Sequence, residues 1–360
     1  MAKIMENRSA NLLHDKKLLS WLAETPEEPL EEELEIVDAH HHIWDMRELK
    51  GYNLFGIFKQ QLYMTDELID DFVGGGHNVI GSVYVTAHAF FQKDPEPAYM
   101  APLGEVQFVQ GIAAQFASGK YGENLRVASG IVGSADLATY GAELEPLLVA
   151  CKAASPNYRG IRCTGAHDPK VKNAPTHPTP GLYADAKFRE GFALLEKHGL
   201  LFDAWVFSSQ LPEVADLAKA FPNTTIVLNH AGTPIAGLGN YSGAPEYDGK
   251  QAEILRSWKQ SMQAIVECPN VFVKIGGLVL PYVGSGMESL DKPVGSEDLA
   301  SKVREAFTFV VQAFGPQRHV RVQLPCGQGR VQLHGSLERV QAALRRFARR
   351  GSLQVVQWYC

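Results

Sequence analysis

Two hydrophobic patterns follow each other along this chain. Short apolar runs rich in β-branched residues predict strands, and longer amphipathic stretches between them predict helices. The predicted strands cover Glu35 to His42, Asn78 to Thr86, Arg126 to Gly133, Tyr158 to Cys163, Leu200 to Phe207, Thr224 to Asn229, Val271 to Ile275 and, on the weakest pattern, His319 to Leu324. The predicted helices cover Gly141 to Ala154, Ala186 to His198, Gln210 to Ala220, Gln251 to Glu267 and Ser296 to Phe314.

This alternation predicts an α/β fold. Several of the strands are nearly unbroken apolar runs, as parallel strands covered on both faces are. Eight strands alternating with helices favour a (β/α)8 TIM barrel over an open doubly wound sheet, which usually has a glycine-rich phosphate turn after its first strand. We expect the barrel over residues 34–318, an acidic helical N-terminal extension over 1–33 and a divergent tail over 319–360.

Composition narrows the function. The chain has 360 residues and a net charge of −6, which argues against a nucleic-acid or anionic-membrane partner. Its five cysteines are scattered without a C-x-x-C pair, as suits a reducing compartment. The N-terminus carries charges where a signal peptide needs an apolar core, and no apolar run approaches membrane-spanning length. We therefore expect a cytoplasmic protein that acts on a small molecule; the sequence does not indicate its oligomeric state.

The first predicted strand ends in a histidine pair. Strand alternation puts Asp38, His40 and His42 on one face and His41 on the other. Two neutral imidazoles on one face can hold a metal or share proton transfer. For so short a motif, a packed or surface histidine cluster has about equal weight.

Other polar side chains belong to the fourth and sixth predicted strands. TIM-barrel enzymes place their chemistry at the carboxyl ends of the strands. Arg159 and Arg162 offer guanidinium groups that could hold a carboxylate or a lactone oxygen, or could instead pair with Asp38 or Asp203. His230 alone would be read as a packed histidine, but three histidines at one rim favour a catalytic centre.

Six segments carry a family resemblance. They are Ile36 to Asp45, Arg159 to Arg162, Phe202 to Trp205, Gln210 to Glu213, Thr225 to Gly232 and Val273 to Leu278. In order and spacing they resemble the amidohydrolase-2 family, predicted metal-dependent TIM-barrel hydrolases, in the branch with L-fuconolactonase, L-rhamnonolactonase and pyrone-dicarboxylate lactonase. The resemblance implies hydrolysis of a lactone or related carbonyl compound. A metal or cationic cluster would polarise the carbonyl, and a carboxylate or imidazole would activate water.

The resemblance also assigns roles. It implies that His40, His42 and His230 form the catalytic centre, and that Arg159 and Arg162 bind an anionic substrate group. His40 and His42 would hold a divalent metal such as zinc, if one is bound.

Two positions depart from the family pattern. Thr86 stands where this branch usually has a glutamate, and Ser208 where it usually has a histidine. A neutral hydroxyl offers a metal no charge and is a poor general base near neutral pH. These departures favour a catalytically silent barrel as the alternative. A further alternative is a decarboxylase, because the wider family also performs that reaction.

The tail departs further. Permitted codons for residues 320–329, read one base later, encode phenylalanine, glutamate, serine, asparagine, phenylalanine, proline, valine, aspartate and lysine, the eighth strand expected from the family. We therefore expect that the tail from about His319 is a frameshifted reading. Arginine pairs such as Arg345-Arg346 would then be a by-product of the shift.

Overall fold

The computed structural model describes residues 24–26, 32–45, 62–172, 174, 176–287 and 290–315, and its centre is a curled parallel sheet. Within these residues the sheet has seven strands in chain order: β1 (Glu35–His41), β4 (Asn78–Val85), β5 (Arg126–Ser134), β6 (Tyr158–Thr164), β7 (Leu201–Trp205), β8 (Ile226–Leu228) and β9 (Val271–Val273). A separate antiparallel pair is formed by β2 (Trp44–Asp45) and β3 (Leu62–Tyr63).

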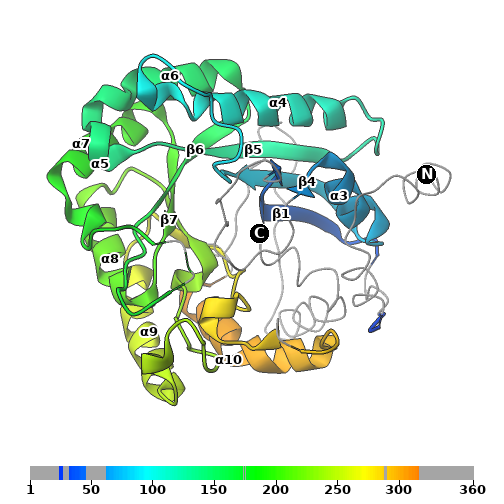
Figure 1. Cartoon of the computed structure of the whole chain (residues 1–360), viewed down its shortest axis with the longest axis vertical. Helices are drawn as coiled ribbons and strands as arrows, with labels where there is room; N and C mark the ends of the chain where they lie inside the picture. The colour runs from blue at the N-terminus through cyan, green and yellow to red at the C-terminus, as the bar shows by residue number, and fades with distance from the viewer. Residues whose placement is uncertain are drawn as a thin grey trace.

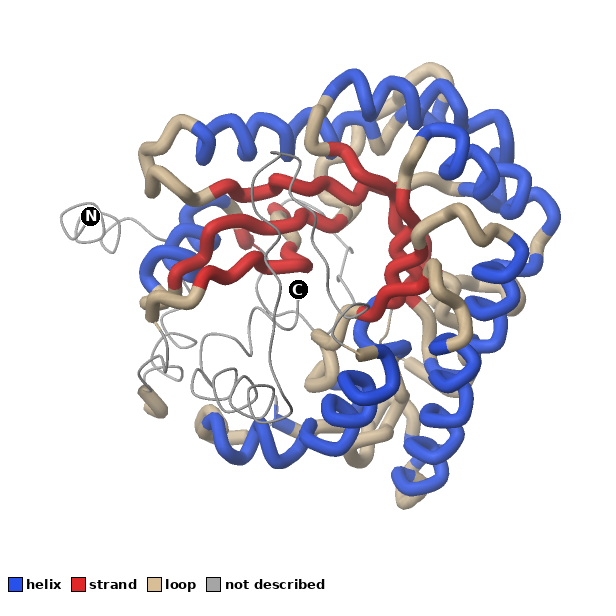
Figure 2. The backbone as a smooth tube through the Cα atoms, turned by 180° about the vertical axis from the view of Figure 1, so that it is seen from behind, coloured by secondary structure: helices blue, strands red, loops and turns tan. Residues whose placement is uncertain are grey.

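Helices cover the outer face of this sheet, as Figures 1 and 2 show from opposite sides. They are α3 (Thr65–Ile69), α4 (Leu103–Ala117), α5 (Leu137–Tyr140), α6 (Glu145–Ala154), α7 (Ala186–His198), α8 (Leu211–Ala220), α9 (Gln251–Val266) and α10 (Ser296–Phe314). None of the described helices is long and apolar enough to cross a membrane.

Helix α7 illustrates how the sequence sets these elements. The Asp185 side chain accepts a hydrogen bond from the Phe188 backbone N–H and caps the helix start. Gly199 ends the helix in the left-handed region, with φ of 63°. Phe188, Phe192 and Leu195 recur at helical spacing and are fully buried in the main core. Local caps and the apolar stripe therefore define both the bounds and the packing face of α7.

A glycine fixes the close approach of β6 and β7. A Cβ added at Gly160 would lie 2.1 Å from the Leu201 carbonyl oxygen, so only glycine allows this spacing. The pairing that results places Arg162 directly beside Asp203 in the sheet. The fold thus brings two candidate site residues onto neighbouring strands.

The α/β fold with a curled parallel sheet agrees with the sequence. The first seven predicted strands are all present, although β8 and β9 are shorter than expected. Helix α4 was not predicted. The eighth predicted strand, the tail and nearly all of the N-terminal extension lie outside the described residues, and those predictions remain open.

Candidate active site

The structure brings the three predicted histidines together at the carboxyl ends of β1 and β8. The Nε2 atoms of His40 and His42 lie 3.2 Å apart, and the ring centroids of His40 and His230 lie 4.9 Å apart. His41 points to the other side of β1, where its ring packs against Phe72 and Tyr84. The period of two along β1 therefore separates the His40–His42 pair from a core histidine.

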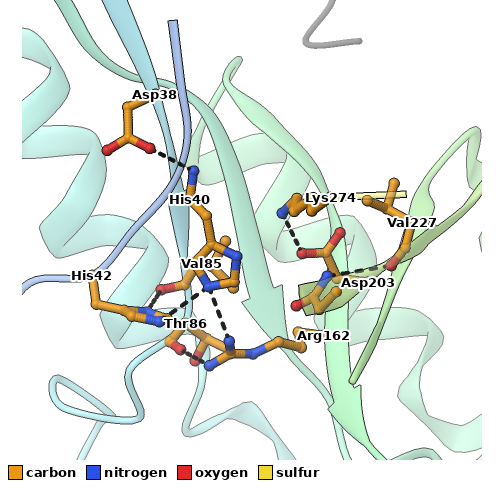
Figure 3. Close-up of polar contacts among 10 residues, drawn as sticks. Asp38, His40, His42, Val85, Thr86, Arg162, Asp203, Val227 and Lys274 are labelled. Carbon is orange, nitrogen blue, oxygen red and sulfur yellow. Dashed lines mark hydrogen bonds and ion pairs between the residues drawn. The ribbon is translucent and has the colours of Figure 1, made fainter. Parts of the chain in front are cut away.

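The tautomer of His42 follows from its neighbour. Its Nδ1 lies 2.6 Å from the backbone carbonyl oxygen of Val85, which can only accept a hydrogen bond. Nδ1 must therefore carry the proton, and Nε2 of the neutral ring keeps a lone pair that can accept one. That lone pair faces the Nε2 atom of His40, as Figure 3 shows.

Arg162 contacts the same pair. Its Nη1 lies 3.3 Å from His40 Nε2, and its Nη2 donates to the Thr86 carbonyl oxygen at 2.6 Å (Figure 3). Among the described residues no carboxylate forms an ion pair with this guanidinium. Burial lowers the pKa of Arg162, but a guanidinium stays charged at neutral pH. A partly buried cation that has no carboxylate partner among the described residues is a candidate binding point for an anion.

A second cation lies on the opposite side of the centre. Lys274, which follows β9, donates to the Asp203 carboxylate with 2.7 Å between Nζ and Oδ2. Both side chains are buried, and Figure 3 shows the ammonium group on the side of Asp203 that faces His40. The expected alternative partner of an arginine, Asp203, is thus paired with lysine. Asp38 accepts from the His40 backbone N–H at 2.9 Å.

Burial and these two cations keep the imidazoles neutral. Burial lowers the pKa of His40 well below its ordinary range, and the nearby charges of Lys274 and Arg162 lower it further. Burial and the charge of Arg162 also lower the pKa of His42, and the pKa of His230 falls to about 3. Burial raises the pKa of Asp38. At neutral pH the centre therefore combines three uncharged nitrogen bases with two fixed cations.

The other predicted residues lie elsewhere or act indirectly. Arg159 is the second residue of β6, at the strand end opposite to the histidines, and its Nη1 donates to the Pro156 and Tyr158 carbonyl oxygens. The Thr86 hydroxyl donates to Glu105. The Ser208 backbone N–H donates to the Thr233 carbonyl oxygen at 3.1 Å. The structure does not bring Arg159 into the histidine centre.

Sequence reasoning missed Lys274, the Asp203–Lys274 pair and Glu105. A charged residue inside an apolar strand is a usable signal, and both Phe202-Asp203-Ala204 and Val273-Lys274-Ile275 have one. Glu105 had no such signal, because its helix was not predicted.

Comparison with known proteins decides the family. A family model for amidohydrolases, Amidohydro-2, matches residues 37–320. The chain belongs to the amidohydrolase-2 family. It is 27% identical over 279 residues to the uncharacterised protein y4mH of Sinorhizobium fredii, covering 75% of this chain and 81% of that protein. It is 28% identical over 134 residues to an L-fucono-1,5-lactonase of Burkholderia multivorans, covering 37% of this chain and 40% of the lactonase.

Solved amidohydrolases share the fold of this family member. A Burkholderia multivorans amidohydrolase with bound HEPES has a TM-score of 0.55 at 21% identity, covering 89% of this chain and 95% of that structure. A Burkholderia multivorans amidohydrolase structure with bound zinc has a TM-score of 0.54 at 21% identity, with the same coverage.

Proposed function

We propose that this amidohydrolase hydrolyses a lactone or a related small carbonyl compound. The observation that carries the proposal is the convergence of His40, His42 and His230 with the guanidinium of Arg162, which has no ion-pair partner among the described residues. The partial match to a lactonase supports this type of substrate. Closure of the sheet by an eighth strand, giving a complete TIM barrel, belongs to the same proposal.

Hydrolysis of a lactone needs positive charge that stabilises the developing oxyanion and a base that activates water. Arg162 and Lys274 are fixed cations in a buried site, where charge stabilisation of a developing oxyanion is strongest. The lone pair on His42 Nε2 is held toward the centre by the Val85 contact, and we assign it to accept the proton of the attacking water. Breaking the ring C–O bond then releases an alkoxide, which takes this proton back from the imidazolium.

The Arg162 guanidinium also favours an anionic substrate. A carboxylate on the substrate would give Arg162 the charge partner that it lacks among the described residues. Such pairing would offset the cost of burying the charge, which is what lowers the pKa of Arg162. Arg159, bound to backbone carbonyl oxygens, keeps no comparable role in this proposal.

The described residues fit a resident metal poorly. His40 and His42 are the residues that would hold one, and a zinc-bound structure shares the fold. However, the described residues contain no group of three or more histidine, cysteine, aspartate or glutamate side chains arranged for a metal ion. Arg162 Nη1 lies 3.3 Å from the nitrogen that a metal would need, and its charge repels a dication. The proposed reaction therefore runs through the guanidinium.

Chelation tests this point. We expect purified protein treated with EDTA to keep at least half of its hydrolytic activity and to hold well under one equivalent of zinc by elemental analysis. Loss of activity on chelation, with full recovery on adding zinc, would show that a metal takes part.

The test of the function is a hydrolysis screen. Sugar lactones and carboxylate-bearing lactones are offered to the protein, and acid release is followed with a pH indicator. We expect Arg162→Met to lower kcat/KM for the best substrate by about 100-fold, because it removes a charge-assisted contact and an electrostatic stabiliser. Arg159→Met, on the same strand, is the matched control and should stay within twofold of the original protein.

Two other results would replace this proposal. Release of CO2 from an aromatic or unsaturated acid, without lactone hydrolysis, would indicate a decarboxylase. The absence of any turnover would favour a silent barrel, the alternative that Thr86 and Ser208 support.

A further inference from the structure

A buried carboxylate outside the histidine centre accepts hydrogen bonds from one segment of the described chain. Glu105, in the first turn of α4, is 1% exposed and accepts four hydrogen bonds. The donors are the Tyr84 hydroxyl at 3.0 Å, the Thr86 hydroxyl, the Ala87 backbone N–H at 3.0 Å and the Ala89 backbone N–H at 3.3 Å. All four donors belong to residues 84–89, which we call the β4 turn.

The β4 turn is a strained piece of backbone. His88 has φ of 58°, in the left-handed region that residues other than glycine rarely adopt. Glu105 binds the amides on either side of it, those of Ala87 and Ala89. A strained conformation persists only where its surroundings hold it, and here the carboxylate holds it.

The same turn presents two consecutive carbonyl groups to the site. The Val85 carbonyl oxygen lies 2.6 Å from His42 Nδ1, and the Thr86 carbonyl oxygen accepts from Arg162 Nη2 at 2.6 Å (Figure 3). One contact sets which nitrogen of His42 carries the proton, and the other orients the guanidinium. The direction of these carbonyl groups depends on the turn that Glu105 fixes.

We propose that Glu105 and Thr86 are positioning residues of this enzyme, which act through the β4 turn to set the tautomer of His42 and the orientation of Arg162. The Thr86 hydroxyl connects the carboxylate to the turn and also accepts from the His88 backbone N–H at 3.3 Å. Threonine at this position, where a glutamate was expected, is thus part of a different polar arrangement. The effect on turnover rests on the proposed function, but the effect on His42 does not.

The primary test reads the histidine directly. Protein labelled with 15N-histidine is studied by NMR at pH 7, and the His42 signals are assigned by comparison with His42→Gln. In the original protein we expect Nδ1 to carry the proton in nearly all molecules. In Thr86→Val, which removes only the hydroxyl at similar volume, we expect a clear fraction of the Nδ1-bare tautomer. Thr86→Ser should restore the original spectrum.

Glu105→Gln provides a second variant. Its amide NH2 is itself a donor and cannot accept hydrogen bonds from the N–H and O–H groups of the β4 turn. We therefore expect a larger shift toward the Nδ1-bare tautomer. Tyr84→Phe is the control, because it removes one contact of Glu105 and leaves Thr86 in place. Thermal melts show which variants are folded.

Turnover gives the independent arm. With an anionic substrate we expect Thr86→Val to raise KM about tenfold, because Arg162 binds the substrate, and to lower kcat as well, because a fraction of the molecules then lacks the His42 Nε2 lone pair. A folded Thr86→Val with the original tautomer and the original KM would overturn the proposal. If no substrate is found, the proposed function fails, and the NMR result alone still decides the positioning role.

Discussion

At the residue scale, His230 depends on a glycine across the site. His230 has φ of 51°, which strains its backbone, and its side chain is buried. Gly277 has φ of 73°, and a Cβ there would lie 2.2 Å from His230 Nδ1. No side chain fits at residue 277 without moving the histidine. The close approach of Gly277 therefore fixes the place of the third imidazole.

Substituting this glycine should disable the site. We expect Gly277→Ala to lower kcat/KM at least tenfold and to reduce the free energy of unfolding by about 1–3 kcal/mol, through the strained φ and the displaced ring. Gly249→Ala is the matched control, because Gly249 has φ of 73° with no atom near the added Cβ. It should lose only the stability that the strained φ costs and should keep the activity; equal losses of activity in both variants would contradict this account.

His41 makes a separate prediction about pH. Burial lowers its pKa to about 3, so the folded protein keeps it neutral while the unfolded chain takes up a proton below about pH 6.5. The stability that it contributes is complete above that pH and is lost as the pH falls toward 3. Between pH 6 and 4, the free energy of unfolding of His41→Phe should therefore fall by about 1.4 kcal/mol less per pH unit than that of the original protein.

Urea unfolding at pH 7, 6, 5 and 4 measures the difference between the two proteins. Buried groups common to both, such as His42, cancel in this comparison. Parallel curves for the two proteins would mean that His41 titrates as freely in the folded protein as in the unfolded chain.

Residue-level reasoning from the sequence predicted that the three histidines lie together, as they do in the structure, but it did not separate Arg162 from Arg159. The period of two in a strand predicts that His40 and His42 share a face. The same rule places Arg159 and Arg162, three residues apart, on opposite faces, so only one could face the centre. Glu105 was out of reach, because its contacts join α4 to a turn 16 to 21 residues earlier and depend on tertiary packing.

At the element scale, strands were easier to predict than the loops and helices after them. The apolar runs fixed seven strands to within a few residues, since burial on both faces leaves a clear signal. Helix α4 contains Gly104 and Gly111, and a glycine in a helix interior costs about 1 kcal/mol. Its buried Val106, Val109 and Phe116 show that packing of an apolar face outweighs this cost.

The Asp203–Lys274 pair links β7 to the end of β9 across β8. Removing one partner leaves a buried charge alone, so Lys274→Met should destabilise the fold by about 3–5 kcal/mol. The double variant Asp203→Asn with Lys274→Met should be more stable than Lys274→Met, because no charge is then left unpaired. Urea unfolding of the original protein, the two single variants and the double variant completes the double-mutant cycle. A double variant whose loss equals the sum of both single losses would show that the two groups are independent.

At the scale of the whole molecule, the described sheet has β1 and β9 at its edges. An unpaired edge exposes a row of backbone N–H and C=O groups, which natural sheets pair, cover or keep short. A TIM barrel closes by pairing an eighth strand with both edges. The sequence predicts that strand at His319 to Leu324, outside the described residues.

The frameshift hypothesis makes the last prediction. If residues from about 319 are a shifted reading, their side chains were never selected to fit this core. Arg321 and Gln323 share one face of the predicted strand, and each would cost about 1–3 kcal/mol if buried without a partner. A chain carrying the alternative reading frame from His319 onward should therefore melt several degrees higher than the chain as written. Expressing both chains and comparing their melting temperatures checks this, and an equal or higher value for the chain as written would refute the frameshift hypothesis.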